Sequence, residues 1–345
     1  MKRYLLAPLA SAVMMASTGA VADVSPLDAI PQDTGFSGYV AFGAASNKLE
    51  SNMVTGTSLG DFDNERTSSL TKSPSSETES SGFINGEVRY TWANSRTQVV
   101  LGNDMVDALR YDLATQIGVR QEFGNSGVVG ISYLFSAFPT QVFKDPYQTG
   151  VKRSDTDQTS NGFRITWDGI IGSNFDAMMS FREVDVDDEF SGTALGLSAA
   201  DRRLLERDGD DSTFELLYRW NVAKGHTIAP AIRYIDRDRD GGAMRSEETG
   251  FQLSYLYSGS QKWNFSANLY AANDDYDKRS PIPAFNNKKR DDDILGGSFT
   301  AFYNEPMGWK DWRVMASAAY YEGDSNISFY DSEVRNFSLG MFYAF

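Results

Sequence analysis

The chain has 345 residues, no cysteine and a formal charge of −15, from 32 Lys and Arg against 47 Asp and Glu. The lack of cysteine excludes disulfide scaffolds, Cys-ligated metal centres and thiol catalysis. The acidic balance argues against nucleic-acid binding, which needs a basic surface. Aromatic residues make up 13% of the chain, too many for a disordered protein.

The first 22 residues have the three parts of a secretory signal peptide in the right order. Lys2 and Arg3 form a basic start, an apolar stretch follows to about Ala16, and Ala20-Val21-Ala22 is a cleavage motif. We expect cleavage near Ala22 and export across the inner membrane. Residues 23–34 are predicted to be a short periplasmic lead-in, and residues 35–345 one folded domain.

From residue 36 onward the dominant signal is a two-residue alternation. In 213–220, Phe214, Leu216, Tyr218 and Trp220 share one face, while polar side chains share the other. Such alternation predicts strands with one apolar and one polar face. The predicted strands are 36–46, 82–92, 96–103, 111–123, 128–138, 160–168, 175–184, 212–221, 226–235, 249–258, 263–273, 293–303, 312–322 and 332–345.

The connections between these strands alternate between short and long. The short ones are 93–96, 124–127, 169–174, 223–225 and 259–262; the long polar ones are about 47–81, 139–159, 185–211, 236–248 and 274–291. Short turns on one side and long loops on the other are typical of outer-membrane barrels. The sequence therefore predicts an all-β, transmembrane, antiparallel up-and-down β-barrel of about 14 strands, with 12 and 16 as alternatives.

The C-terminal strand carries a more specific pattern. Apolar residues alternate up to a final aromatic residue, at Phe337, Leu339, Met341, Tyr343 and Phe345. This resembles the C-terminal signature of Gram-negative outer-membrane β-barrels, which implies recognition by the barrel-assembly machinery. The opening strand, Gly35 to Val40, is similar to that of an uncharacterised outer-membrane barrel family without an assigned activity. The resemblance implies an outer-membrane location, with membrane lipid as a partner. The acidic loop 185–211 suggests a further partner, lipopolysaccharide, whose phosphates divalent cations would bridge to the loop.

The polar faces of the strands point into the predicted lumen. They carry Arg89, Arg120, Arg164, Arg182, Arg219, Arg233 and Arg313, together with Glu87, Asp168 and Glu215. Four of the arginines, at 164, 182, 219 and 233, come from consecutive strands and would form one wall. Charged rings of this kind give channels their ion selectivity. The alternative is that arginines and carboxylates pair and fill the lumen.

A second pattern suggests a metal site. Asp236, Asp238 and Asp240, followed by Gly241 and Glu247, fit the spacing of a calcium-binding loop. The flanking segments are predicted strands, whereas such loops usually join helices. Arg237 and Arg239 also supply internal counter-charges, so a self-paired solvated loop is the alternative to a Ca²⁺ site.

Catalysis has little support in the sequence. The one histidine, His226, lies in a predicted periplasmic turn, so a Ser-His-Asp arrangement at the extracellular mouth is not available. The leading prediction is a porin-like channel for passive passage of small hydrophilic solutes, with some preference for anions. A non-conducting structural or surface-interaction barrel with acidic loops is the alternative, and an outer-membrane enzyme comes third.

Overall fold

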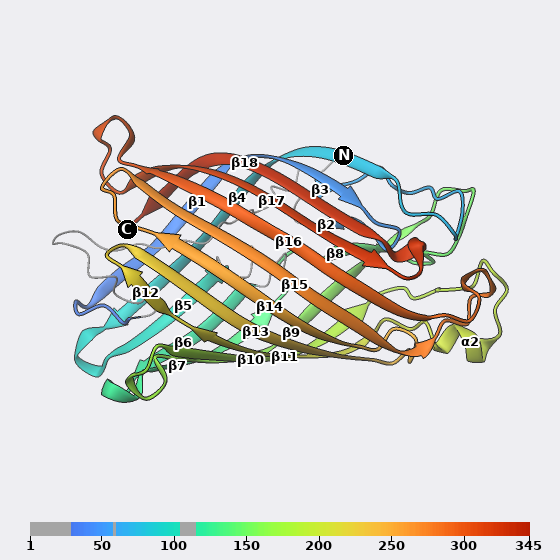
Figure 1. Ribbon diagram of the computed structural model, residues 1–345, viewed down its shortest axis with the longest axis horizontal. Coiled ribbons are helices and arrows are strands. Elements are labelled where there is room, and N and C mark those ends of the chain that lie inside the picture. The colour runs from blue at the N-terminus through green and yellow to red at the C-terminus, as the bar shows by residue number, and fades with distance from the viewer. Residues whose placement is uncertain (1–28, 58–59, 104–114) are drawn as a thin grey trace.

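A computed structural model describes residues 29–57, 60–103 and 115–345. The chain forms a closed antiparallel β-barrel of 14 strands (Figure 1). The wall consists of β1(Gly35–Glu50), β4(Ser76–Trp92), β5(Thr97–Asn103), β6(Thr115–Glu122), β7(Val128–Phe135), β9(Asp155–Asp168), β10(Phe175–Val186), β11(Gly209–Tyr218) continued by β12(Trp220–Ala223), β13(His226–Arg239), β14(Ser246–Tyr257), β15(Trp263–Arg279), β16(Lys289–Asn304), β17(Trp312–Ser325) and β18(Ser332–Ala344). Pairing of β1 with β18 closes the barrel.

The predicted number of strands is confirmed, and each predicted range overlaps one strand of the wall. Most strands extend further on the long-loop side than predicted, however. The range predicted as 226–235 is a strand that runs to Arg239, and the range predicted as 263–273 runs to Arg279. The residues that extend these strands are charged, so the hydrophobic alternation used for the prediction stops before the strand does. The signal peptide and residues 111–114 of the fourth predicted strand lie outside the described residues.

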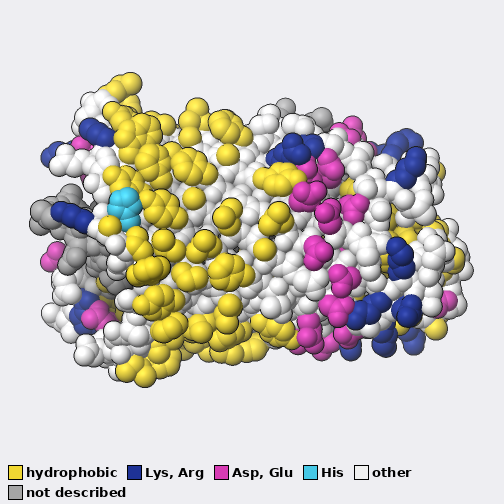
Figure 2. Space-filling view, viewed as in Figure 1, with side chains coloured by type: hydrophobic (Ala, Val, Ile, Leu, Met, Phe, Trp, Pro, Cys, Tyr) yellow, Lys and Arg dark blue, Asp and Glu magenta, His cyan; other side chains and the backbone are white. Residues whose placement is uncertain are grey.

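The outer face of the barrel carries a band of hydrophobic side chains (Figure 2). Among them, Phe163, Ile131 and Leu269 are each more than half exposed, which is the arrangement expected where lipid replaces water. All six tryptophans of the chain lie at the short-turn ends of the strands, at positions 92, 167, 220, 263, 309 and 312. This matches an aromatic belt at a membrane interface.

No α-helix among the described residues is long and apolar enough to cross a membrane.

Several inward-facing aromatic rings lie flat against glycines of the neighbouring strands. The Phe83 ring covers Gly43 and Gly340, and a Cβ atom at Gly296 would lie 2.1 Å from Cδ1 of Tyr321. Glycine next to an aromatic ring on a barrel wall lets the ring pack along the strand. These rings therefore take up less of the lumen than their size suggests.

Candidate functional site

All ten charged residues predicted to line the lumen occupy inward-facing strand positions. Along each strand they alternate with residues that face outward. Five of them are buried, namely Glu87, Arg120, Arg164, Glu215 and Arg313. The alternation was therefore sufficient to assign the face of each residue. It did not show which of these residues pair with each other.

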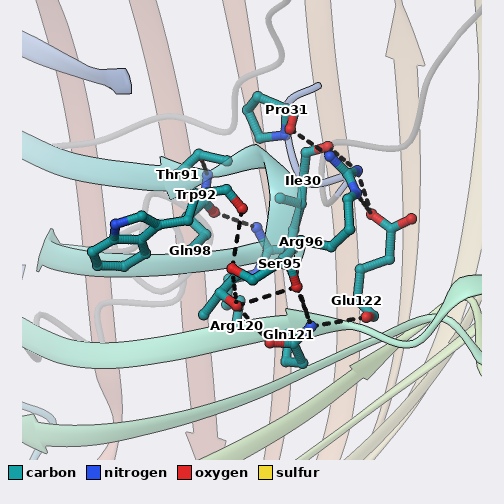
Figure 3. Close-up of polar contacts among 11 residues, drawn as sticks. Ile30, Pro31, Thr91, Trp92, Ser95, Arg96, Gln98, Arg120, Gln121 and Glu122 are labelled. Atoms are coloured by element: carbon teal, nitrogen blue, oxygen red, sulfur yellow. Dashed lines mark hydrogen bonds and ion pairs between the residues drawn. The ribbon is translucent and has the colours of Figure 1, made fainter. Parts of the chain in front are cut away.

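At the short-turn end, charged residues form local networks (Figure 3). Arg120 donates to Gln98 Oε1 at 3.0 Å and pairs with Asp168 at 3.1 Å. Arg96, which sequence reasoning did not single out, pairs with Glu122 and donates to the backbone carbonyls of Ile30 and Pro31. These bonds tie the lead-in segment to the rim of the barrel.

The predicted arginine wall is present on four consecutive strands of the barrel, but it divides into two groups. Arg219 pairs with Asp176 near the short-turn end of β10 and β11. Arg164, Arg182 and Arg233 lie further along β9, β10 and β13, and Glu215 of β11 stands directly opposite Arg233 in the strand register. Asp211 of β11 stands opposite Arg182, so three arginines and two carboxylates share this part of the wall.

Nearer the long loops, a second charged network crosses the wall. Arg237 lies 2.7 Å from Glu248 and 3.1 Å from Asp274, while Arg290 pairs with Asp292 on the next strand. Sequence reasoning placed these residues in loops. Continuing the period-two count from Arg233 to Arg237 would have placed Arg237 on the inward face.

Some buried polar groups of the lumen wall have no hydrogen-bond partner among the described residues. These include both amide atoms of Asn85 and the hydroxyls of Ser266 and Ser338, all inward-facing. An unsatisfied buried polar group costs about 1–3 kcal/mol.

Six long connections fold together into what we call the cap, formed by residues 51–57, 60–75, 136–154, 187–208, 240–245, 280–288 and 326–331. Long loops of outer-membrane barrels face the cell exterior, so the cap is assigned to the extracellular end. Its buried core contains Tyr147, Leu205, Ala243, Ile282, Phe285, Ile327, Phe329 and Tyr330. The sequence predicted loops here and gave no sign of a shared core.

Polar contacts join three of the connections in the cap. Arg153 is fully buried and donates to the carbonyls of Asn52, Pro146 and Asn64 at 2.8, 3.0 and 2.7 Å. The Asp145 carboxylate accepts from the backbone of Gly192 and Ala194. These bonds hold the β1–β4, β7–β9 and β10–β11 connections to one another.

Two buried tyrosines of the cap predict a dependence on high pH. Burial, reinforced at Tyr147 by Tyr330, raises the pKa of both hydroxyls above the ordinary value of 10. The stability that they contribute is complete below pH 10 and is lost as the pH rises toward their raised values. Ionised tyrosine absorbs in the ultraviolet, so the absorbance can be followed as the pH is raised. A Tyr147→Phe, Tyr330→Phe variant should lose only the part of the absorbance increase that occurs above the main tyrosine transition. Loss of absorbance from the main transition near pH 10 would contradict this.

The predicted calcium loop is a hairpin of two strands. Asp236 and Asp238 lie on β13 and face outward, Glu247 stands opposite Asp236 on β14, and Asp240 lies in the turn. The prediction of a continuous loop was wrong because the charged residues extend the strands. Among the described residues, no group of three or more His, Asp or Glu side chains is arranged to hold a metal ion.

His226 lies at the start of β13 beside a short turn. Its Nδ1 is 2.7 Å from the Tyr255 hydroxyl, and its ring contacts Tyr257. Both tyrosines belong to the outer surface near the short-turn end. The histidine therefore sits among interfacial aromatics at the end of the barrel opposite the cap.

The closed barrel, its hydrophobic band and its polar lumen define a transmembrane β-barrel of the outer-membrane type. The chain belongs to a family described as protein of unknown function (DUF2860), whose sequence profile matches residues 35–344. No curated protein matches the chain.

Several solved structures are similar over most of the chain. The outer-membrane channel DcaP of Acinetobacter baumannii is 9% identical, with 90% of this chain and 98% of that one covered and a TM-score of 0.44. An FadL homologue of Pseudomonas aeruginosa is 10% identical over 92% of both chains, with a TM-score of 0.43. An anion-selective porin from Comamonas acidovorans is 10% identical. The match covers 91% of this chain and 100% of that one, with a TM-score of 0.38.

Proposed function

We propose that this protein is an outer-membrane channel for passive passage of small hydrophilic solutes, with a preference for anions. The observation that carries the proposal is the charge balance of the lumen wall. Between the short turns and the Arg237 network, seven inward-facing arginines, at 89, 120, 164, 182, 219, 233 and 313, face six carboxylates, at 87, 122, 168, 176, 211 and 215. An excess of positive charge along a hydrated lumen favours anions over cations.

Ion selectivity tests this proposal. Replacing Arg164, Arg182 and Arg233 together by glutamine removes three positive charges from one wall and should shift the reversal potential in a salt gradient toward cation preference. The matched control replaces Arg202, Arg203 and Arg335 by glutamine, because these residues lie on the cap surface and the outer face. Equal reversal potentials for the two triple variants would refute a selective role for the wall.

A second candidate, a non-conducting surface-interaction barrel, is favoured by an acidic belt on the outer face. Figure 2 shows a row of acidic side chains next to the hydrophobic band. In the strand register, several of them stand opposite one another across strand pairs. The pairs are Asp210 with Asp238, Asp236 with Glu247, Glu247 with Asp275, Asp275 with Asp291, and Asp293 with Asp324. Like charges directly opposite each other destabilise a sheet, so this belt suits divalent cations that bridge to lipopolysaccharide phosphates.

Calorimetry with Ca²⁺ tests this second candidate. An Asp236→Asn, Glu247→Gln variant should bind Ca²⁺ more weakly than the parent, and the difference should grow in vesicles that contain lipopolysaccharide. An Asp201→Asn, Glu206→Gln variant, changed in the cap, is the matched control. Identical heats for parent and belt variant would remove the bridging role.

We also propose that the outward row of β18 serves assembly. Phe337 and Leu339 are exposed on the lipid face, and the backbone of Phe345 exchanges hydrogen bonds with Gly38 at 2.9 and 3.1 Å. The row is therefore placed next to the closing strand. Replacing Phe345 by alanine should slow assembly by the barrel-assembly machinery more than Phe299→Ala does; equal rates would contradict the proposal.

A further inference from the structure

The cap reaches across the mouth of the barrel. In the order of the strands around the wall, the β7–β9 connection lies opposite the β17–β18 connection. The hydroxyl of Tyr147, from the first, is 2.8 Å from the hydroxyl of Tyr330, from the second. Direct contact between side chains from opposite sides of the rim means that the cap spans the opening.

The contacts between the Tyr147 side and the β17–β18 side of the cap differ in kind from the contacts within the Tyr147 side. Around Tyr147, backbone and charged hydrogen bonds join the connections to one another, as Arg153 and Asp145 show. Across the mouth, Tyr147 meets Phe329, Phe285 and Tyr330 through ring contacts, with centroid separations of 5.4, 6.3 and 6.5 Å. Two hydrogen bonds from the β1–β4 connection also cross, from Asn52 to the Phe329 carbonyl at 3.0 Å and from Ser73 to Asp331 at 2.7 Å. The centre of this boundary is therefore apolar, and parting it breaks a few side-chain hydrogen bonds but no backbone ladder.

The far side of this boundary is anchored to the barrel wall. The Arg290 guanidinium lies 4.0 Å from the ring centre of Tyr330 in the cap and 4.3 Å from that of Tyr276 on the inner face of β15. Stacking of this kind attaches Tyr330 to the wall by a cation–π contact on each ring. When the boundary parts, the β17–β18 side can remain on the wall while the Tyr147 side moves away.

From this arrangement we infer that the cap is a gate, closed in this structure, and that solutes enter when Tyr147 separates from Phe285, Phe329 and Tyr330. The inference rests on the proposed channel function, because a gate requires a path behind it. It assigns control of entry to the apolar boundary in the cap, whereas the proposed ion preference depends on the arginines in the lumen.

Cysteine labelling combined with solute uptake tests the gate. The chain has no cysteine, so an Ala243→Cys substitution in the buried cap core gives one reactive thiol whose maleimide labelling reports opening. In this background, Tyr147→Ala, Phe285→Ala and Tyr330→Ala are compared with Phe190→Ala, which changes an exposed aromatic ring of the cap. Uptake of glucose and gluconate is followed by swelling of liposomes that contain each variant.

Truncation of a buried aromatic ring removes more than the 1.4 kcal/mol that equals a factor of ten. Labelling should therefore rise by about tenfold or more in the core variants and stay unchanged in Phe190→Ala. Swelling rates should follow the same order as the labelling rates. Swelling that does not follow labelling overturns the gate but leaves the channel in place. Absence of swelling in every variant overturns the channel, and the gate with it.

Discussion

Replacing Arg153 by methionine is expected to unfold the β1–β4 and β7–β9 parts of the cap while the barrel remains intact. Its guanidinium donates to carbonyls of both connections and stacks on Phe143 at 3.6 Å. Methionine fills similar space but leaves these buried carbonyls without donors. The cost should be about 3 kcal/mol of local stability, which speeds hydrogen exchange of residues 143–153 by about a hundredfold.

The neighbouring residue supplies the control for this prediction. Lys152→Met removes the same charge, but Lys152 is largely exposed and pairs with Glu65 at the surface. Exposed ion pairs contribute about 0–1 kcal/mol, so exchange should change little. Arg153→Lys should resemble the methionine variant, because a point charge does not replace the planar fork. Equal protection in Arg153→Met and Lys152→Met would show that Arg153 does not organise the cap.

Replacing Gly43 by valine is expected to prevent closure of the barrel. Gly43 lies on β1 opposite Gly340 of β18. A Cβ atom there would be 2.3 Å from the Leu339 carbonyl oxygen and 2.6 Å from Gly340 Cα. Because these are backbone atoms of the closing strand, relief requires the two strands to separate. We expect a loss of about 3 kcal/mol or more of folding stability.

The adjacent position tests whether this effect comes from the seam itself. Ala44→Val adds bulk to the same strand, but on the outward face, and should leave the urea midpoint and the folded fraction on semi-native gels nearly unchanged. Folded Gly43→Val at the parental yield would contradict the close packing of Phe83, Gly43 and Gly340.

The wall of the barrel was predictable because each strand carries its own signal. The alternation at Phe214, Leu216 and Tyr218 follows from lipid on one side and polar groups on the other, and it needs no knowledge of neighbouring strands. The same alternation assigned Arg164 and Arg233 to the lumen. It failed at strand ends such as Asp236 to Arg239, where both faces are charged because the strand has left the membrane.

The cap was not predictable by this means. Tyr147, Phe285 and Tyr330 are far apart in the sequence and stand in polar segments without periodicity, so nothing local indicates that they share a core. Arg153 likewise resembles any basic loop residue until its carbonyl partners are known. Pairing inside the lumen, such as Arg237 with Glu248 and Asp274, depends on strand register, which alternation alone does not fix.

Single-channel recording in planar bilayers tests the central claim most directly. Folded protein should give discrete current steps, with longer open times in Tyr147→Ala than in Phe190→Ala and with anion preference in a salt gradient. Correctly folded parent and Tyr147→Ala barrels that both pass no current would contradict the account and leave the surface-interaction barrel as the better description.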